Sequence, residues 1–191
     1  MFAPRPHSKE IQTQKSAISS RFQYGKTALQ SGRSRRPRAR NGIVKSGILD
    51  TNILLYAANR DCREHTSARK FLENALRSAG LAYLTEGICY EFLRASTHPK
   101  VFPSPLDGPQ ALAWVRTLLE APNFHLLSTG PNHWHTLSSL LSGLHAPSGN
   151  LFFDIRTATL MQEHGIRTIY TADTDFLQFK ELEVINPLSR T

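Results

Sequence analysis

Apolar residues from position 47 onward fall into short clusters, with spacing that alternates between that of strands and that of helices. Compact apolar runs, typical of buried strands, occupy residues 48–49, 81–84, 124–127, 167–170 and 184–185. Apolar residues three or four positions apart, typical of helices with one buried face, occupy residues 53–58, 65–78, 88–97, 109–119, 133–144 and 152–164. Strands that alternate with helices predict an α/β fold, in which a central parallel sheet is flanked by helices on both faces.

The beginning of the chain shows neither spacing. We therefore expect a disordered N-terminal extension, residues 1–45, followed by one folded domain, residues 46–190. The extension holds 11 of the 23 Lys and Arg residues but only one of the 15 acids, a charge of +10, whereas the rest of the chain carries −2, so the net charge of +8 belongs to the extension and the domain is nearly neutral. We favour a passive tail or a misassigned start codon as its explanation. Contact with RNA through its basic run and a transit peptide are the alternatives.

Several classes of protein do not fit the remaining composition. The two cysteines, Cys62 and Cys89, lie far apart, which is the pattern of neither a disulfide framework nor a zinc site and favours a cytoplasmic protein. Apolar stretches are shorter than the roughly 18 residues that a membrane span needs. The motifs of serine hydrolases, P-loop proteins, zinc proteases and dinucleotide-binding folds are missing from the sequence.

The helix expected over residues 133–144 has an apolar face that we assign to the core. Its members are Trp134, Leu137, Leu140, Leu141 and Leu144. Three histidines, His133, His135 and His145, flank this face. Because residues two apart point to different sides of a helix, we expect surface or capping histidines rather than a shared metal site.

Acidic residues follow two of the expected strands. Asp50 comes directly after Ile48-Leu49, and Asp173 and Asp175 follow the strand that ends at Tyr170. Ligands of open α/β sheets bind at the carboxyl ends of the strands. We therefore expect these acids to line one cleft.

Two further acids interrupt apolar stretches of expected helices. Glu91 lies within residues 88–93, and Asp154 follows Phe152-Phe153. A carboxylate buried on such a face without a partner would cost several kcal/mol. A divalent cation would supply the missing positive partner, and carboxylate oxygens are the ligands that Mg²⁺ and Mn²⁺ prefer.

Each acid also has a simpler interpretation. Asp50 is a favourable helix N-cap, Glu91 an exposed helix residue, and Asp154 an acid favoured in the first turn of a helix. Asp173 and Asp175 suit a turn. Taken together, their positions favour a common site over five separate structural roles.

Four segments, in this order, resemble the motifs of PIN domains, and of VapC-type members in particular. The segments are Gly47–Tyr56 (GILDTNILLY); Tyr90–Arg94 (YEFLR) with Thr97-His98-Pro99; Asp154 with Ala158 and His164-Gly165; and Tyr170–Phe176 (YTADTDF) with Leu182 and Asn186-Pro187. The resemblance implies a PIN-like fold and an endoribonuclease that needs Mg²⁺ or Mn²⁺. It also implies the toxin of a toxin–antitoxin pair, inhibited by a cognate antitoxin protein. Since two-fold dimers are the commonest symmetric assembly, we also expect a homodimer.

The resemblance also assigns roles to individual residues. Matched position by position, the catalytic and metal-binding acids are Asp50, Glu91, Asp154 and Asp173, with Asp175 as a further ligand. Thr51, Asn52 and Thr171 would orient ligands or water, and Arg94 would bind substrate phosphate or form a structural ion pair. Hydrolysis of an RNA phosphodiester by metal-activated water should leave a 5′-phosphate and a 3′-hydroxyl.

Two departures and two rival functions accompany this hypothesis. The segment after Asp154 reads Ile155-Arg156-Thr157-Ala158, where members of the family more often have an Ala-rich run, and the long extension is atypical. An aspartyl-phosphate phosphatase would have a second Asp at position 52, where this chain has Asn52. A PIN-like module that binds RNA or a protein without cleavage is the alternative function.

Overall fold

The computed structural model describes residues 44–189 of the chain, and within them all expected strands and helices are present. The strands are β1 (Gly47–Leu49), β2 (Ala82–Thr85), β3 (Phe124–Leu127), β4 (Thr168–Tyr170) and β5 (Glu183–Ile185). The helices are α2 (Thr51–Ala58), α3 (His65–Arg77), α4 (Glu86–Ser96), α5 (Gly108–Leu119), α6 (His133–Ser142), α7 (Leu151–Glu163) and the 3-10 helix η1 (Asp175–Gln178). The expectations for residues 1–43 fall outside the described part.

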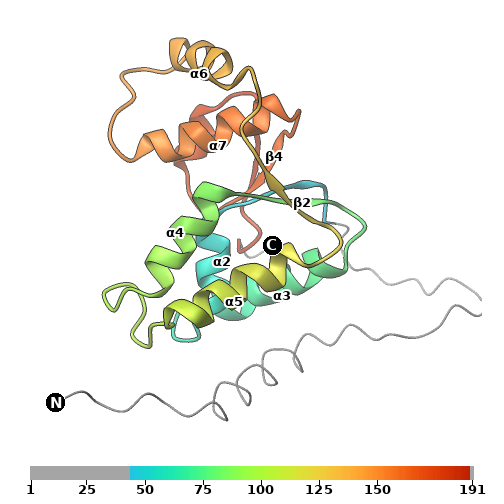
Figure 1. Cartoon of the computed structure of the whole chain (residues 1–191), viewed down its shortest axis with the longest axis vertical. Helices are drawn as coiled ribbons and strands as arrows, with labels where there is room; N and C mark the ends of the chain where they lie inside the picture. Colours follow the sequence, from blue (N-terminus) through green and yellow to red (C-terminus); the bar gives the residue numbers. More distant parts are fainter. Residues whose placement is uncertain (1–43, 190–191) are drawn as a thin grey trace, which may run out of the picture. The chain divides into compact units, whose positions relative to one another are not determined.

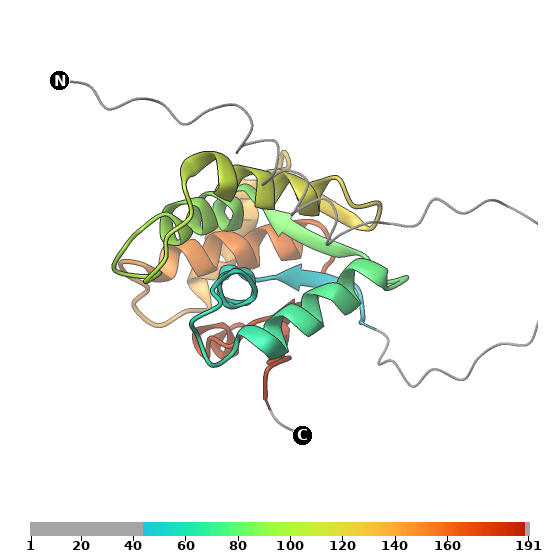
Figure 2. The ribbon, with the colours of Figure 1, turned by 90° about the horizontal axis from the view of Figure 1, so that it is seen from below.

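The five strands form one parallel sheet in the order β3-β2-β1-β4-β5. The chain moves outward from β1 to β3 and then returns to the other side of β1. Connections between parallel strands are almost always right-handed, so this reversal sends the next helices to the opposite face. Helices α2 to α5 accordingly lie on one side of the sheet, and α6 and α7 on the other (Figures 1 and 2). The predicted α/β architecture is confirmed.

The reversal places the carboxyl ends of β1 and β4 side by side. Leu49 pairs with Tyr170, and the backbone N–H of Asp50 donates to the carbonyl of Tyr170 at 3.0 Å. Asp50 and Thr171 therefore leave the sheet next to each other although 121 positions separate them. Such a switch point is where open α/β sheets bind ligands.

The core consists of the central strands and the helix faces that cover them. Strand β1 is buried along its whole length, as expected of a strand with helices above and below it. The largest fully buried side chains include Ile48, Leu49, Phe92, Ile155 and Phe176. Within the described residues, no helix combines the length and apolar character needed to cross a membrane.

Helix α6 differs from the sequence-based assignment. Trp134, assigned to the core, is 77% exposed, while His133, assigned to the surface or a cap, is buried and its Nδ1 lies 2.7 Å from Oε2 of Glu163. The helical spacing correctly identified an amphipathic helix but not which side of it faces α7. The side chain of Glu163 at the end of α7 is buried and pairs with the ring of His133. The side of α6 that carries His133 therefore faces α7, and Trp134 faces outward.

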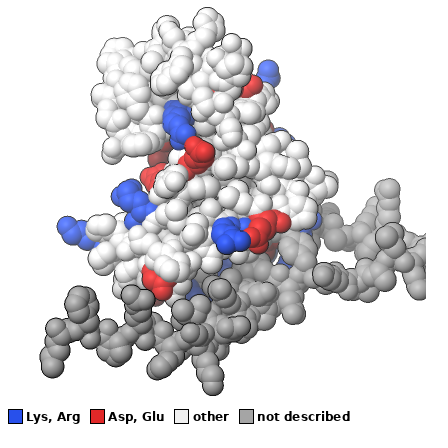
Figure 3. Space-filling model, in the orientation of Figure 1, with Lys and Arg blue, Asp and Glu red and all other residues white. Residues whose placement is uncertain are grey.

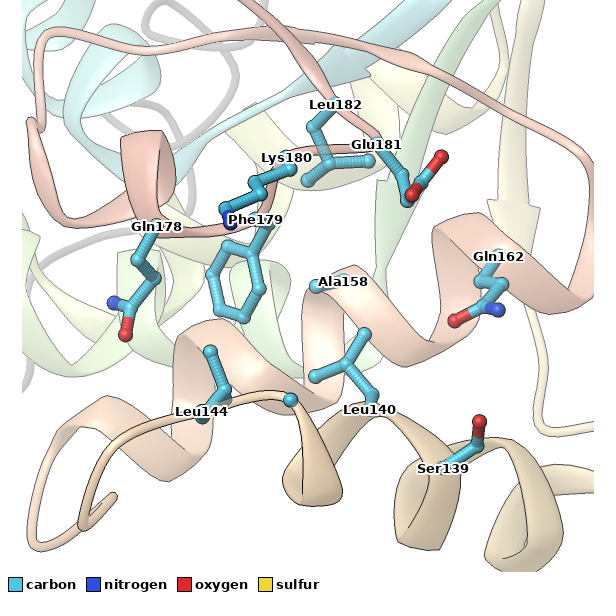
Figure 4. A pocket seen from close by; sticks show the side chains of 11 residues that line it. Ser139, Leu140, Leu144, Ala158, Gln162, Gln178, Phe179, Lys180, Glu181 and Leu182 are labelled. Atoms are coloured by element: carbon cyan, nitrogen blue, oxygen red, sulfur yellow. The ribbon is translucent and has the colours of Figure 1, made fainter.

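The other apolar residues of this face are half-buried, and two of them line a hollow rather than the core. Leu140 and Leu144 face Phe179 and Leu182 across a cavity of ≈ 370 Å³ between α6, α7 and the segment after η1 (Figure 4). None of the acids assigned to the site lines this cavity. The cavity and the expected acidic cleft are therefore separate features.

Candidate active site

Asp50 is the buried centre of the acidic site. It caps α2, and its carboxylate accepts hydrogen bonds from the backbone N–H of Thr51 (2.7 Å), Nδ2 of Asn52 (2.6 Å) and Oγ1 of Thr171 (2.6 Å). Burial raises the pKa of Asp50 from 3.8 to about 6, against these hydrogen bonds, and the nearby carboxylates of Glu91 and Asp173 raise it further. The capping interpretation is correct, and it coexists with membership of the acidic cluster.

Thr171 and Asn52 connect the two strand ends into one scaffold. The hydroxyl of Thr171 donates to Asp50 and accepts from Nδ2 of Asn52 (2.8 Å) and from the backbone N–H of Asp173 (2.9 Å). Oδ1 of Asn52 accepts from the backbone N–H of Ala172 at 3.1 Å. Local turn residues after β4 are thus held by side chains that follow β1, which orients Asp173 relative to Asp50.

Glu91 reaches the site from α4 but does not occupy the apolar face expected for it. Its Oε2 accepts a hydrogen bond from Oγ1 of Thr51 at 2.9 Å, and its side chain is 48% exposed. Its neighbours on α4, Ile88 and Phe92, are buried, so the apolar contacts of the helix are made beside Glu91 rather than by it. The premise that Glu91 interrupts a buried face was wrong, although its placement beside the start of α2 was correct.

Asp154 enters from the first turn of α7 and is half-buried. Its pKa is raised from 3.8 to about 7, first by burial and then by the negative charges of Asp50, Asp173, Asp175 and Glu91. Since all four other acids contribute repulsion, the five carboxylates share one electrostatic environment. This is the strongest structural sign that the acids form one site.

Asp173 and Asp175 lie at the exposed rim. Oδ1 of Asp173 accepts from the backbone N–H of Asp175 at 2.9 Å, and Asp175 begins η1. The turn interpretation therefore also applies to this pair. Figure 3 shows acidic side chains in a recess between the α6–α7 part and the part formed by α2 to α5, with basic side chains near it.

The types of donor at this site fit a divalent cation, but in the described part of the chain their side chains do not stand in a metal-binding arrangement. The site offers hard carboxylate oxygens and no thiolate or imidazole, the set that Mg²⁺ and Mn²⁺ prefer. Burial, and after it the repulsion between carboxylates, raises the pKa values of Asp50 and Asp154, and a bound cation would offset both costs. Among residues 44–189, however, no three His, Cys, Asp or Glu side chains already stand in a metal-binding group. Side chains of exposed acids would have to turn inward to complete one.

Arg94 lies one turn after Glu91 on α4, with its Nη2 3.8 Å from Oε1 of that residue. The structural ion pair and a phosphate-binding role thus remain compatible. Sequence reasoning missed two exposed aromatic residues, Tyr90 (72% exposed) and Phe153 (68% exposed). Each directly precedes an acid of the site, and apolar side chains flanking charged positions were the available signal.

Replacing Thr171 with valine is expected to destabilise the fold by about 2 kcal/mol, because the buried hydroxyl both donates to Asp50 and accepts two N–H groups. Urea unfolding measures this loss. The matched control is Thr159→Val on α7, a buried threonine whose hydroxyl, among residues 44–189, donates to the carbonyl of Ile155 in its own helix. Equal losses for both variants would contradict a special role for Thr171.

Comparisons with known proteins agree with this geometry. The PIN domain family model matches residues 47–182. Over 141 residues the chain is 33% identical to Ribonuclease VapC33 of Mycobacterium tuberculosis (strain ATCC 25618 / H37Rv), which covers 74% of this chain and 97% of that protein.

Solved structures of the same kind share the fold. The sarcin-ricin loop cleaving toxin VapC20 of Mycobacterium tuberculosis aligns over 69% of this chain and 93% of its own, with a TM-score of 0.53 and 15% identity. VapBC2 from Rickettsia felis, solved with a DNA fragment from its promoter, aligns over 73% of this chain and 96% of its own, with a TM-score of 0.52 and 18% identity. Together, the family match and the VapC33 relationship show that the chain belongs to the PIN domain family, among relatives named as VapC ribonucleases.

Proposed function

We propose that this protein is a Mg²⁺- or Mn²⁺-dependent endoribonuclease and the toxin of a toxin–antitoxin pair. The observation that carries the proposal is the convergence of Asp50, Glu91, Asp154 and Asp173 from four separate elements on one electrostatic environment. A relative named a ribonuclease, 33% identical over 74% of this chain, supports the same activity.

In this proposal Asp50, Glu91, Asp154 and Asp173 hold the cation, with Asp175 at the rim as a further ligand. A bound divalent cation would polarise a phosphodiester and lower the pKa of water. Thr51, Asn52 and Thr171 orient the carboxylates through the hydrogen bonds described above. Arg94, which lies beside Glu91, would contact phosphate.

Asp154 has an additional property in the metal-free protein. Its pKa of about 7 lets it take up or release a proton near neutral pH. The carboxylate of Asp50 accepts three hydrogen bonds, which fix its orientation as a ligand. Hydrolysis by this arrangement leaves a 5′-phosphate and a 3′-hydroxyl.

The same proposal includes two protein partners. The first is a cognate antitoxin, which the likeness to VapBC2 supports, and we expect it to cover the acidic recess. A homodimer is the second expected assembly. Both are tested by size-exclusion chromatography with light scattering, on the chain alone and on the chain with the product of a neighbouring gene.

One observation favours the non-cleaving alternative, a PIN-like module that binds RNA or protein. The described residues hold no ready-made group of three metal-binding side chains. Cleavage assays separate the two functions, because a binding module would retain RNA affinity without any metal-dependent product.

The deciding experiment is incubation of the full chain, free of antitoxin, with tRNA, rRNA and mRNA in Mg²⁺, Mn²⁺ or EDTA. We expect cleavage in either cation, none in EDTA, and products that a 5′-phosphate-dependent exonuclease degrades. Asp50→Asn should lower the rate of cleavage at least a thousandfold, and circular dichroism should confirm that the variant is folded. RNA binding without cleavage by a folded, metal-saturated protein on all three substrates would favour the binding module.

A further inference from the structure

Arg156 lies against the beginning of α4, one turn before the proposed catalytic Glu91. Its Nη2 is 3.8 Å from Oε2 of Glu86, and a Cβ built on Gly87 would lie only 2.5 Å from its Nη1. Since Gly87 and Glu91 are four positions apart, they share one face of the helix. The absence of a side chain at Gly87 is what allows the guanidinium to approach this face.

Arg94 occupies the same face one turn after Glu91. The face therefore runs from Arg156, seated at Gly87, through Glu91 to Arg94. At a rise of 1.5 Å per residue, the seven steps from Gly87 to Arg94 span roughly 10 Å of helix. Two positive groups thus flank one acid of the proposed site along a single line.

Both guanidinium groups keep donors available for a ligand. An Arg side chain has five N–H donors. Within residues 44–189, Arg156 and Arg94 each have one ion pair, both at 3.8 Å, longer than a hydrogen bond, and both with partly exposed acids. Exposed pairs of this length contribute little stability, so structural pairing does not explain the arrangement.

We propose that Arg156 and Arg94 contact phosphates on either side of the scissile bond of a single-stranded RNA and so set its path across Glu91. This rests on the proposed nuclease function, but it concerns binding of the substrate rather than its cleavage. Guanidinium groups bind phosphate bidentately, and two of them on one helix face define a direction for the strand.

The exposed aromatic residues indicate that the bound strand is unpaired. Tyr90 precedes Glu91 on α4, Phe153 precedes Asp154 on α7, and both rings are exposed. Proteins that bind single-stranded RNA combine basic groups with exposed aromatic rings, on which unstacked bases lie. A duplex would keep its bases out of reach of both rings.

The test measures binding of a fluorescein-labelled single-stranded oligoribonucleotide by anisotropy, with the full chain carrying Asp154→Asn so that no cleavage is required. Arg156→Gln should raise Kd about fivefold and lower the slope of log K against log salt by about 0.7. Arg156→Lys should recover part of the affinity. Duplex RNA of the same sequence should bind more weakly.

Three controls separate this role from a structural one. Glu86→Gln breaks the same ion pair but keeps the arginine, so affinity should be unchanged or higher. Arg116→Gln removes an exposed, ion-paired arginine of α5 and should leave Kd within twofold. Gly87→Ala displaces the guanidinium while retaining its charge, and should weaken binding without lowering the melting temperature.

The outcomes distinguish this inference from the proposed function. Equal Kd values for Arg156→Gln and Arg116→Gln would overturn the inference, even if the unsubstituted chain cleaves RNA. A parallel loss in Glu86→Gln would assign the ion pair a structural role and also overturn it. Arginine-dependent binding by a chain that cleaves no RNA would leave the inference standing and refute only the nuclease proposal.

Discussion

Replacing Asp154 with asparagine is expected to abolish RNA cleavage and, at the same time, to raise the thermal stability of the metal-free protein at pH 8. The carboxylate is charged at that pH despite burial and four nearby acids, which raise its pKa to about 7. Asparagine keeps the shape of the side chain and removes the charge. The substitution therefore relieves repulsion in the fold while it deletes a ligand of the proposed cation.

The size of the two effects follows from the position of the residue. Loss of a metal-binding carboxylate should reduce cleavage at least a thousandfold. Because Asp154 is only half-buried, solvent screens much of its repulsion, and the gain in stability is about 1 kcal/mol. In a domain of this size that gain raises the melting temperature by about 3 °C.

Differential scanning fluorimetry in EDTA, at pH 5 and pH 8, measures the stability of Asp154→Asn. At pH 5 the carboxyl is protonated in the folded protein and resembles asparagine, so the difference should shrink. The control is Asp61→Asn, an exposed aspartate of the α2–α3 connection, which should change neither stability nor cleavage. If Asp154→Asn were as active as the unsubstituted chain, Asp154 would not belong to the active site. If its melting temperature at pH 8 were lower, the proposed repulsion between the carboxylates would be wrong.

Divalent cations are expected to stabilise the unsubstituted protein more strongly as the pH rises from 5.5 to 8. The pKa values of Asp50 and Asp154 are about 6 and 7 in the folded protein, above 3.8 for an unperturbed aspartate. The folded state therefore holds these protons more tightly than the unfolded state. Their contribution to stability is present at low pH and is lost as the pH rises through about 6 and 7.

A cation reverses this loss because it binds the deprotonated carboxylates and competes with their protons. At a concentration one hundred times Kd, binding adds about 2.7 kcal/mol to stability, or about 5–10 °C in melting temperature for a domain of this size. Near pH 5.5 both carboxyl groups are largely protonated, and the added stability should fall to a small fraction of that value.

Melting curves with MgCl₂ or MnCl₂, against NaCl of equal ionic strength, test this expectation. Asp154→Asn is the informative comparison, because it should lose most of the cation-dependent shift while retaining the fold. If the shift were the same at both pH values, or the same in Asp154→Asn, the cation would bind elsewhere. In that case the acidic recess would be a poor candidate for the metal site.

The order of elements could be predicted because its signals are local. Apolar runs and helical spacing over a few residues identified every strand and every α-helix of the described part, with small shifts at their ends. Alternation of the two predicted the parallel sheet. Acids directly after β1 and β4 were recognised as neighbours because carboxyl ends of parallel strands meet at one edge. The short helix η1 lacks such a pattern and was not predicted.

The environments of individual side chains could not be predicted in this way. Sequence patterns treated Glu91 as buried and His133 as exposed, and the structure has the reverse. Which face of a helix is covered depends on the neighbour it meets, and that neighbour comes from a distant part of the chain. For His133 that neighbour is Glu163, 30 positions away.

By itself, the sequence determined the α/β class, the succession of strands and helices, and the set of acids, because propensity and periodicity act over a few residues. Only the tertiary structure decided that Asp50 carries three hydrogen bonds in a buried position, that Asp154 is half-buried among like charges, and that Arg156 rests on Gly87. The physical reason is that burial, repulsion and close approach are properties of pairs. Such pairs form only when residues more than 60 positions apart, such as Gly87 and Arg156, are brought together by the fold.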